Sequence, residues 1–182
     1  MGIHNDVEEI LFTEEQLAQI VRRIGRQINE DYKDKNLLMV SVLKGSLIFM
    51  ADLMREIHIP CAIDFLSVSS YGKGTVSSGE VRIMKDLDQS LEGKDILVIE
   101  DILDSGRTLT YLLKTLAARN PSSIRLCTLL DKPERRQVEV HPDYVGAQVE
   151  DKFIVGYGLD YAEQYRNLPY IGVLKPEIYE NA

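Results

Sequence analysis

The chain has few of the residues that build disulfide frameworks or imidazole-rich metal sites. Its 182 residues include two cysteines, Cys61 and Cys127, both within apolar runs that are typical of strands. Two such thiols suit a reducing compartment as small buried hydrophobic residues. The three histidines, His4, His58 and His141, stand far apart in the sequence, so they predict no zinc site.

The chain also lacks long hydrophobic runs and an excess of positive charge. Its apolar stretches are far too short to span a bilayer, and residues 2–6 carry no basic region followed by an apolar core. The net charge of −8 argues against a broad nucleic-acid surface, which needs clustered lysine and arginine. We therefore expect a cytoplasmic chain that binds neither membrane nor nucleic acid.

Two glycine motifs of nucleotide-binding proteins are missing as well. Lys94 is followed by Asp95, where a phosphate-binding P-loop requires serine or threonine. Gly156 and Gly158 lack the third glycine of a dinucleotide fingerprint, because Tyr161 occupies its position. Neither a P-loop enzyme nor a dinucleotide-binding enzyme is predicted.

What the chain does contain is an alternation of helices and apolar strands. Thr13 and Gln16 form a capping box before a helix whose apolar face includes Leu17 and Ile24. This alternation predicts an α/β fold with a mainly parallel sheet flanked by helices, and the length fits one domain over residues 1–182. The expected strands are 37–43, 61–68, 81–84, 96–99, 124–130, 149–157 and 170–174.

The most informative segment is residues 95–108. An apolar strand at 96–99 runs into Glu100 and Asp101, and the loop Asp-Ser-Gly-Arg-Thr at 104–108 opens an apolar-periodic helix. A turn of small residues before a helix N-terminus is suited to phosphate. Since acids beside it would repel a bare phosphate, the segment implies a phosphorylated sugar bound with a divalent metal ion. The alternative is a surface connection whose acids are incidental.

This segment resembles the phosphoribosyl-pyrophosphate (PRPP) signature of type I phosphoribosyltransferases, in which two acids, an apolar pair, a variable residue and a Thr/Ser-Gly-x-Thr loop follow a strand. Nearly the whole chain resembles the hypoxanthine-guanine branch of that family. The resemblance implies a type I phosphoribosyltransferase fold with a twisted, mainly parallel sheet. Its core would span about residues 35–150, with a small hood at the chain termini, built from the N-terminal helix and the C-terminal segment, and a flexible lid at about 69–80.

The same resemblance implies an enzyme of purine salvage. It would transfer the phosphoribosyl group of PRPP to N9 of hypoxanthine or guanine with Mg²⁺, giving IMP or GMP and pyrophosphate. A homodimer or homotetramer is expected. Asp104 would be the general base that takes the proton from purine N7. The residues expected to bind PRPP and its 5′-phosphate are Glu100, Asp101, Asp104, Ser105, Gly106, Arg107 and Thr108.

Further expected roles fall at other strand ends. The pyrophosphate site would consist of Lys44, Gly45 and Arg166, and the family often has a cis peptide bond before this lysine. The lid would contribute Ser70 and Tyr71. The purine site would consist of Lys132, Phe153, Ile154 and Asp160. The Mg²⁺ ligands would be Glu100, Asp101 and Asp160. Many relatives have lysine where this chain has Arg107, which leaves that side chain's phosphate contact open.

Several of these positions also have ordinary structural interpretations. Taken alone, Lys44 fits a tight turn, Phe153 fits a strand core, and residues 69–80 fit an exposed loop. The charged residues 134–136 are expected to form a solvated loop.

Three other functions stay open: a xanthine-guanine phosphoribosyltransferase, an RNA-binding pyrimidine-operon regulator with uracil phosphoribosyltransferase activity, and a non-catalytic PRPP-binding subunit. The regulator family usually has tyrosine in place of Asp104.

Overall fold

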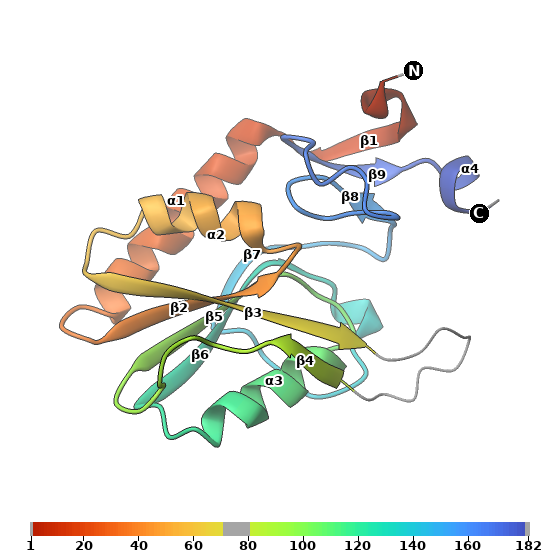
Figure 1. Ribbon diagram of the computed structural model, residues 1–182. Coiled ribbons are helices and arrows are strands. Elements are labelled where there is room, and N and C mark those ends of the chain that lie inside the picture. The colour runs from red at the N-terminus through yellow and green to blue at the C-terminus, as the bar shows by residue number, and fades with distance from the viewer. Residues whose placement is uncertain (1, 71–80, 181–182) are drawn as a thin grey trace.

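The computed structural model describes residues 2–70 and 81–180 (Figure 1). Helices and strands alternate through most of it. The elements are η1 (Ile3–Asp6), β1 (Val7–Phe12), α1 (Glu14–Asp31), β2 (Leu37–Leu43), α2 (Leu47–Arg55), β3 (Cys61–Ser70), β4 (Val81–Lys85), β5 (Asp95–Leu103), α3 (Arg107–Ala117), β6 (Ser123–Asp131), η2 (Pro133–Arg135), β7 (Tyr144–Gln148), β8 (Ile154–Val155), β9 (Ile171–Leu174) and α4 (Pro176–Tyr179).

The central sheet has the strand order β4-β3-β2-β5-β6-β7. Its neighbouring strands run parallel, except that β4 is antiparallel to β3. Helices α1 and α2 cover one face of this sheet and α3 covers the other (Figure 1). The prediction of a mainly parallel α/β sheet flanked by helices is therefore confirmed.

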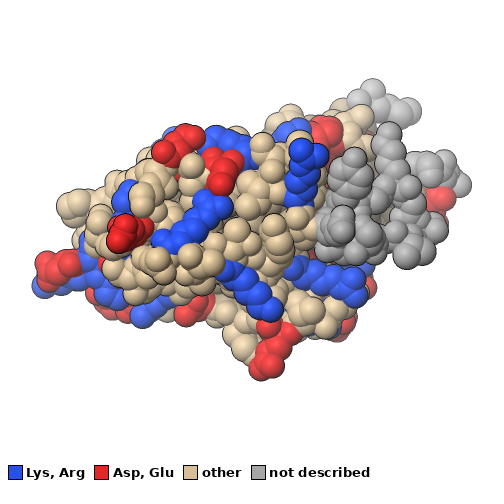
Figure 2. Space-filling view, turned by 60° about the horizontal axis from the view of Figure 1, so that its bottom comes forward, with Lys and Arg blue, Asp and Glu red and all other residues tan. Residues whose placement is uncertain are grey.

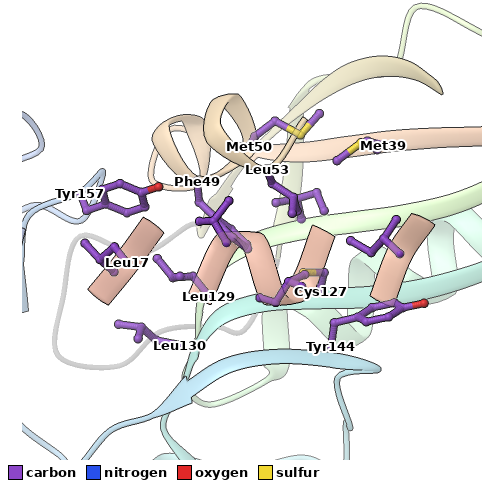
Figure 3. Packing of buried hydrophobic residues seen from close by; sticks show 14 of the residues in the cluster. Leu17, Met39, Phe49, Met50, Leu53, Cys127, Leu129, Leu130, Tyr144 and Tyr157 are labelled. Carbon is purple, nitrogen blue, oxygen red and sulfur yellow. The ribbon is translucent and has the colours of Figure 1, made fainter. Parts of the chain in front are cut away.

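Helix α1 begins at the predicted capping box. The amide of Gln16 donates to Thr13 Oγ1 at 3.2 Å, and the amide of Thr13 donates to Gln16 Oε1 at 2.9 Å. The apolar face of α1 is buried with α2 and the sheet, where Leu17 lies close to Phe49 and Leu129 (Figure 3). Among the described helices, none is both long enough and apolar enough to cross a membrane.

Burial of the sheet on both faces explains the nearly continuous apolar sequence of its inner strands. A second cluster packs Val98 of β5 against Leu112 and Leu116 of α3. Strands β2, β5 and β6 are mutually parallel, so their carboxyl ends meet at one edge of the sheet. The residues that follow these three ends include Lys44, Asp104 and Lys132, which places them on the same side of the molecule.

A second sheet joins segments from both ends of the described chain. Its order is β1-β9-β8, with antiparallel pairing between neighbours. Figure 1 shows it beside the central sheet, close to both termini. Strand β1 was not predicted from the sequence. The division of the chain into a core and a hood remains a prediction.

The expected strand at 149–157 was wrong in its extent. Residues 149–153 are irregular, with a turn in which the Lys152 amide donates to the Glu150 carbonyl at 2.8 Å. Only Ile154–Val155 form a strand, and Gly156 forms an isolated bridge with Leu159. The chain forms β7 instead, just before this segment. Its Gly146 and Ala147 have low strand propensity, so pairing with β6 decides the structure there.

Candidate active site

The loop between β5 and α3 encloses a small cavity at the carboxyl edge of the sheet. Gly106 has a φ of 80° at the N-terminus of α3, and a Cβ there would lie 2.6 Å from Val140 Cγ1. Glycine is therefore required both by the backbone conformation and by the close packing. The cavity has a volume of about 210 Å³ and is lined by Val42, Leu43, Val68, Glu100, Ile102, Leu103, Asp104, Ser105, Gly106, Thr108 and Leu109.

A second cavity, of about 370 Å³, opens beside the first. Asp104 and Ile102 line both cavities, so the Asp104 carboxylate stands where they meet. All four residues predicted for the purine site line this cavity. Its complete lining is Ile102, Asp104, Lys132, Arg135, Asp151, Lys152, Phe153, Ile154, Leu159, Asp160 and Tyr179.

Lys132 enters this second cavity from the end of β6. The residue is only 5% exposed, and its Nζ donates to the Lys152 carbonyl oxygen at 2.8 Å and lies 3.5 Å from Asp151 Oδ1. Its amide donates to the carbonyl of Leu103, which ties β6 to the end of β5. An ammonium has three donors, so donors of Nζ remain available to a ligand.

Phe153 lies on the wall of the same cavity and is 39% exposed. Its ring stacks on Tyr179 at a centroid distance of 4.7 Å and meets the edge of Tyr161 at 5.4 Å. Phe153 is therefore no buried strand residue, whereas Ile154 beside it is buried in β8. The sequence analysis missed Tyr179, because α4 carries no motif of its own.

The turn after β2 brings Lys44 and Gly45 against two other segments. The Leu43–Lys44 peptide bond is cis, as the resemblance implied. A Cβ on Gly45 would collide with the Asp101 carboxylate, and a Cβ on Gly158 would collide with the Gly45 carbonyl. The turn is thus held between the end of β5 and the loop after β8.

Arg166 comes from the same loop as Gly158. Its guanidinium donates to the Gly158 carbonyl at 2.8 Å and lies 2.9 Å from Asp160 Oδ1. The Lys44 Nζ lies 2.7 Å from Glu163 Oε2, and Glu163 also contacts Arg166. The predicted pyrophosphate residues are thus gathered at one place, together with a carboxylate that the sequence analysis did not single out.

Comparisons with known proteins show the family to which the chain belongs. Residues 7–162 match the model of the phosphoribosyl transferase domain. The chain is 54% identical over 177 residues to the hypoxanthine-guanine phosphoribosyltransferase of Bacillus subtilis, covering 97% of this chain and 98% of that protein. The chain belongs to the phosphoribosyltransferase family.

Two further relatives support the assignment. A crystal structure of a hypoxanthine phosphoribosyltransferase from Staphylococcus aureus has a TM-score of 0.94 and 52% identity, covering 97% of this chain and 96% of that one. The bifunctional protein TilS/HprT of Listeria monocytogenes is 56% identical over 178 residues, which are 98% of this chain. The chain spans only 28% of the length of that bifunctional relative.

The acids Glu100 and Asp101 do not mark the end of β5, which runs on to Leu103. The expectation that the strand ends there was wrong. Burial raises the pKa of Glu100 well above its ordinary value, and the neighbouring charge of Asp101 raises it further. Burial also raises the pKa of Asp101, which is 9% exposed. The residues around these two carboxyls thus supply too little positive charge to stabilise their ionised forms.

These acids fit a metal ion. Glu100 Oε2 is buried and has no hydrogen-bond partner within residues 2–70 and 81–180. A divalent cation would supply the missing partner and offset the burial of two carboxylates. Asp160 differs, because Arg166 and the amide of Glu163 already contact its carboxylate. In the described part of the chain, no three His, Cys, Asp or Glu side chains are grouped to hold a metal ion.

Replacing Glu100 with glutamine is expected to stabilise the metal-free protein at pH 8. The pKa of Glu100 is higher in the folded state, so the wild type loses stability as pH rises from about 4 through that raised value. The variant removes this loss, and we expect a Tm gain of roughly 2–4 °C at pH 8, or about 1 kcal/mol. Thermal unfolding with a chelator should show that the gain disappears near pH 4.

A matched control and an added ion make this measurement specific. Glu92→Gln removes the same charge from an exposed carboxylate and should leave Tm unchanged. Mg²⁺ should narrow the difference between the wild type and Glu100→Gln, because a bound cation stabilises the wild-type acids. Equal Tm values for both proteins at pH 8 would show that burial of Glu100 carries no cost.

Arg136 is the functional-site residue that the sequence analysis judged wrongly. It was expected on a solvated loop with Glu134 and Arg135, but its side chain is only 18% exposed. Its guanidinium donates to the carbonyls of Asp104 at 3.0 Å and Val140 at 2.7 Å, and it pairs with Asp131. Arg136 therefore fixes the backbone of the loop that carries Asp104. A run of charged residues gives no signal of this contact.

Arg135, by contrast, is 53% exposed and points toward the site. Its Nε lies 3.2 Å from Asp104 Oδ1, and its Nη1 lies 3.6 Å from Asp151 Oδ1.

The remaining predicted site residues lie on α3 and β3 or outside the described residues. Arg107 is exposed at the start of α3, and Ser105 and Thr108 line the first cavity. The backbone of Ser70 ends β3, whereas Tyr71 and the rest of the predicted lid to residue 80 lie outside the described residues.

Proposed function

We propose that this chain is a hypoxanthine-guanine phosphoribosyltransferase that works in purine salvage. It transfers the 5-phosphoribosyl group of PRPP to N9 of hypoxanthine or guanine and releases pyrophosphate. The observation that carries the proposal is the position of Asp104, which lines both the cavity beside the α3 N-terminus and the cavity that contains Lys132 and Phe153. The Asp104 carboxylate could therefore reach both a sugar phosphate in the first cavity and a purine base in the second.

In this proposal the first cavity binds the phosphoribosyl group. Ser105 and Thr108 hydroxyls, with backbone N–H groups at the start of α3, suit the 5′-phosphate, and the positive end of the helix dipole favours it. Glu100 and Asp101 would hold the ribose hydroxyls and Mg²⁺. The bound Mg²⁺ would neutralise charge on the leaving pyrophosphate.

The second cavity binds the purine. Phe153 offers a partly exposed ring for stacking, and the backbone near Ile154 would read the edge of the base. Lys132 donates to the 6-oxo group, which directs N7 toward Asp104. Xanthine-guanine specificity is the second candidate, because the Lys132 ammonium would equally donate to the 6-oxo group of xanthine.

The chemistry follows from where charge develops. Cleavage of the bond between C1 and pyrophosphate leaves positive charge on the ribose, as in glycoside hydrolysis. Arg166 and the backbone around Lys44 and Gly45 would stabilise the negative charge on pyrophosphate. Asp104 would accept the N7 proton as N9 attacks, so that no charge is left on the nucleotide base. Closure of the lid that carries Ser70 and Tyr71 would exclude water.

The decisive test is a panel of nucleobases with PRPP and Mg²⁺. Hypoxanthine and guanine should give IMP and GMP with one pyrophosphate released per nucleotide, and a chelator should stop both reactions. Xanthine in the same panel tests the second candidate. Turnover of uracil without turnover of hypoxanthine would instead support the regulator family. An RNA-binding regulator needs a surface of clustered lysine and arginine, whereas basic and acidic side chains are interspersed on the face in Figure 2.

The location and assembly of the protein are also proposed. The free thiols of Cys61 and Cys127 suit the reducing cytoplasm, where we place it. A homodimer or homotetramer would cover the apolar side chains that α2 exposes, which include Leu47, Ile48 and Met54. Light scattering coupled to gel filtration would measure the assembly directly.

A further inference from the structure

One carboxylate joins the two cationic side chains of the pyrophosphate site. Glu163 Oε2 lies 2.7 Å from Lys44 Nζ, and Glu163 Oε1 lies 3.1 Å from Arg166 Nη2. Lys44 follows β2, whereas Arg166 follows β8, so the contact spans two distant parts of the chain. Each oxygen of the carboxylate thus serves one cation, and the two cations are close enough for one anion to bridge them.

The backbone holds Glu163 in this place. Ala162 and Glu163 have φ values of 49° and 63°, and the Glu163 amide donates to Asp160 Oδ2 at 2.9 Å. Tyr161 and Gln164 close the turn with two backbone hydrogen bonds of 3.2 and 2.9 Å. The turn therefore presents the Glu163 side chain toward Lys44 and Arg166.

The carboxylate is charged but weakly held. The Glu163 carboxylate pairs with Lys44 at 2.7 Å and with Arg166 at 3.1 Å, and no other cation contacts it in the described residues. Its side chain is 64% exposed, and that of Lys44 is 66% exposed. The side chain of Arg166 is less exposed, at 26%. Because the pair with Lys44 joins two exposed side chains, it contributes little stability, and an anion of higher charge can displace the carboxylate there.

We propose that Glu163 is an internal competitor of pyrophosphate. In the ligand-free protein it occupies the Lys44 ammonium and shares the Nη2 group of Arg166 with Asp160, and it takes these positions back when pyrophosphate leaves. The effect is weaker binding of this product and faster release. This inference rests on the proposed function, because it assumes the proposed pyrophosphate site. It adds the Lys44 ammonium to the backbone groups of Lys44 and Gly45 and to Arg166 as a ligand of pyrophosphate.

The test is calorimetric titration of inorganic pyrophosphate with Mg²⁺ into the wild type and Glu163→Gln. Glutamine keeps the size of the side chain and removes its charge, so we expect pyrophosphate to bind roughly 3–10-fold more tightly. Glu163→Asp keeps the charge and should stay nearer the wild type. Glu139→Gln removes the same charge from an exposed carboxylate elsewhere and should stay within about twofold of the wild type.

Inhibition of turnover by pyrophosphate gives a second readout, since its Ki should fall by the same factor in Glu163→Gln. Unchanged or weaker binding in Glu163→Gln, while the wild type binds pyrophosphate, would overturn this inference and leave the proposed function standing. Equal tightening in Glu139→Gln would also overturn it, because the effect would then be one of net charge. If neither the wild type nor Glu163→Gln binds pyrophosphate, the proposed pyrophosphate site itself is wrong.

Discussion

Replacing Asp104 with asparagine is expected to lower kcat by roughly 10²–10⁴, the usual contribution of a general base. Asparagine keeps the shape of the side chain but cannot act as the base that takes the proton. The loop backbone should be unaffected, because Arg136 holds the Asp104 carbonyl rather than its carboxylate. Steady-state kinetics with hypoxanthine as substrate measures the loss.

PRPP affinity separates this role from a structural one. Ser105, Gly106 and Thr108 line the first cavity independently of the Asp104 carboxylate, so calorimetry should show similar PRPP·Mg²⁺ binding in the wild type and Asp104→Asn. Asp34→Asn is a suitable control, because Asp34 is exposed and asparagine tolerates its φ of 62°. An unchanged kcat would reduce Asp104 to a turn residue.

The ion pair between Arg135 and Asp104 needs a control of its own. The exposed Arg135 lies 3.2 Å from the carboxylate, and Asp104→Asn breaks this contact as well as removing the base. Arg135→Gln breaks only the contact. We expect it to retain most of kcat, because exposed ion pairs contribute little. A loss in Arg135→Gln as large as that in Asp104→Asn would assign the effect to the pair.

Structural features that depend on residues close together in the sequence could be predicted from the sequence. The strand, acids, loop and helix of residues 95–108 lie in one segment, and the capping box of α1 needs only Thr13 and Gln16. Local hydrogen bonds and apolar periodicity determine such elements, so the mainly parallel sheet and the edge that carries the site followed from them.

Features that depend on distant contacts were not predictable. The role of Arg136 becomes visible only in the folded chain, where η2 lies beside the end of β5. Its partners there include the backbone carbonyls of Leu103 and Asp104, and every residue has such a carbonyl, so the sequence does not mark them. Gly45 fits between Asp101 and Gly158, which are far from it in sequence. Strand β7 forms despite weak propensity because β6 offers it an edge. The role of Glu163 likewise depends on its contact with Lys44, which is far from it in the sequence.

The choice of base is expected to depend on Lys132. Its ammonium has donors and no acceptor, so it suits the 6-oxo group of hypoxanthine or guanine, whereas adenine presents an amino group there. The side chain is only 5% exposed, and leaving its remaining donors unpaired against adenine would be costly. Adenine should therefore have a kcat/KM at least roughly 10²-fold below that of hypoxanthine.

Lys132→Ala should lower kcat/KM for hypoxanthine and guanine and narrow the gap to adenine, while PRPP binding changes little. Since alanine leaves space where the stem of Lys132 is buried, Lys132→Met serves as a second variant that keeps the apolar volume. Lys114→Met is the matched control, because Lys114 is exposed on α3 and does not line this cavity. If both Lys132 variants keep full discrimination against adenine, the 6-position is read by another group of this cavity, and the donors of Lys132 serve only Lys152 and Asp151.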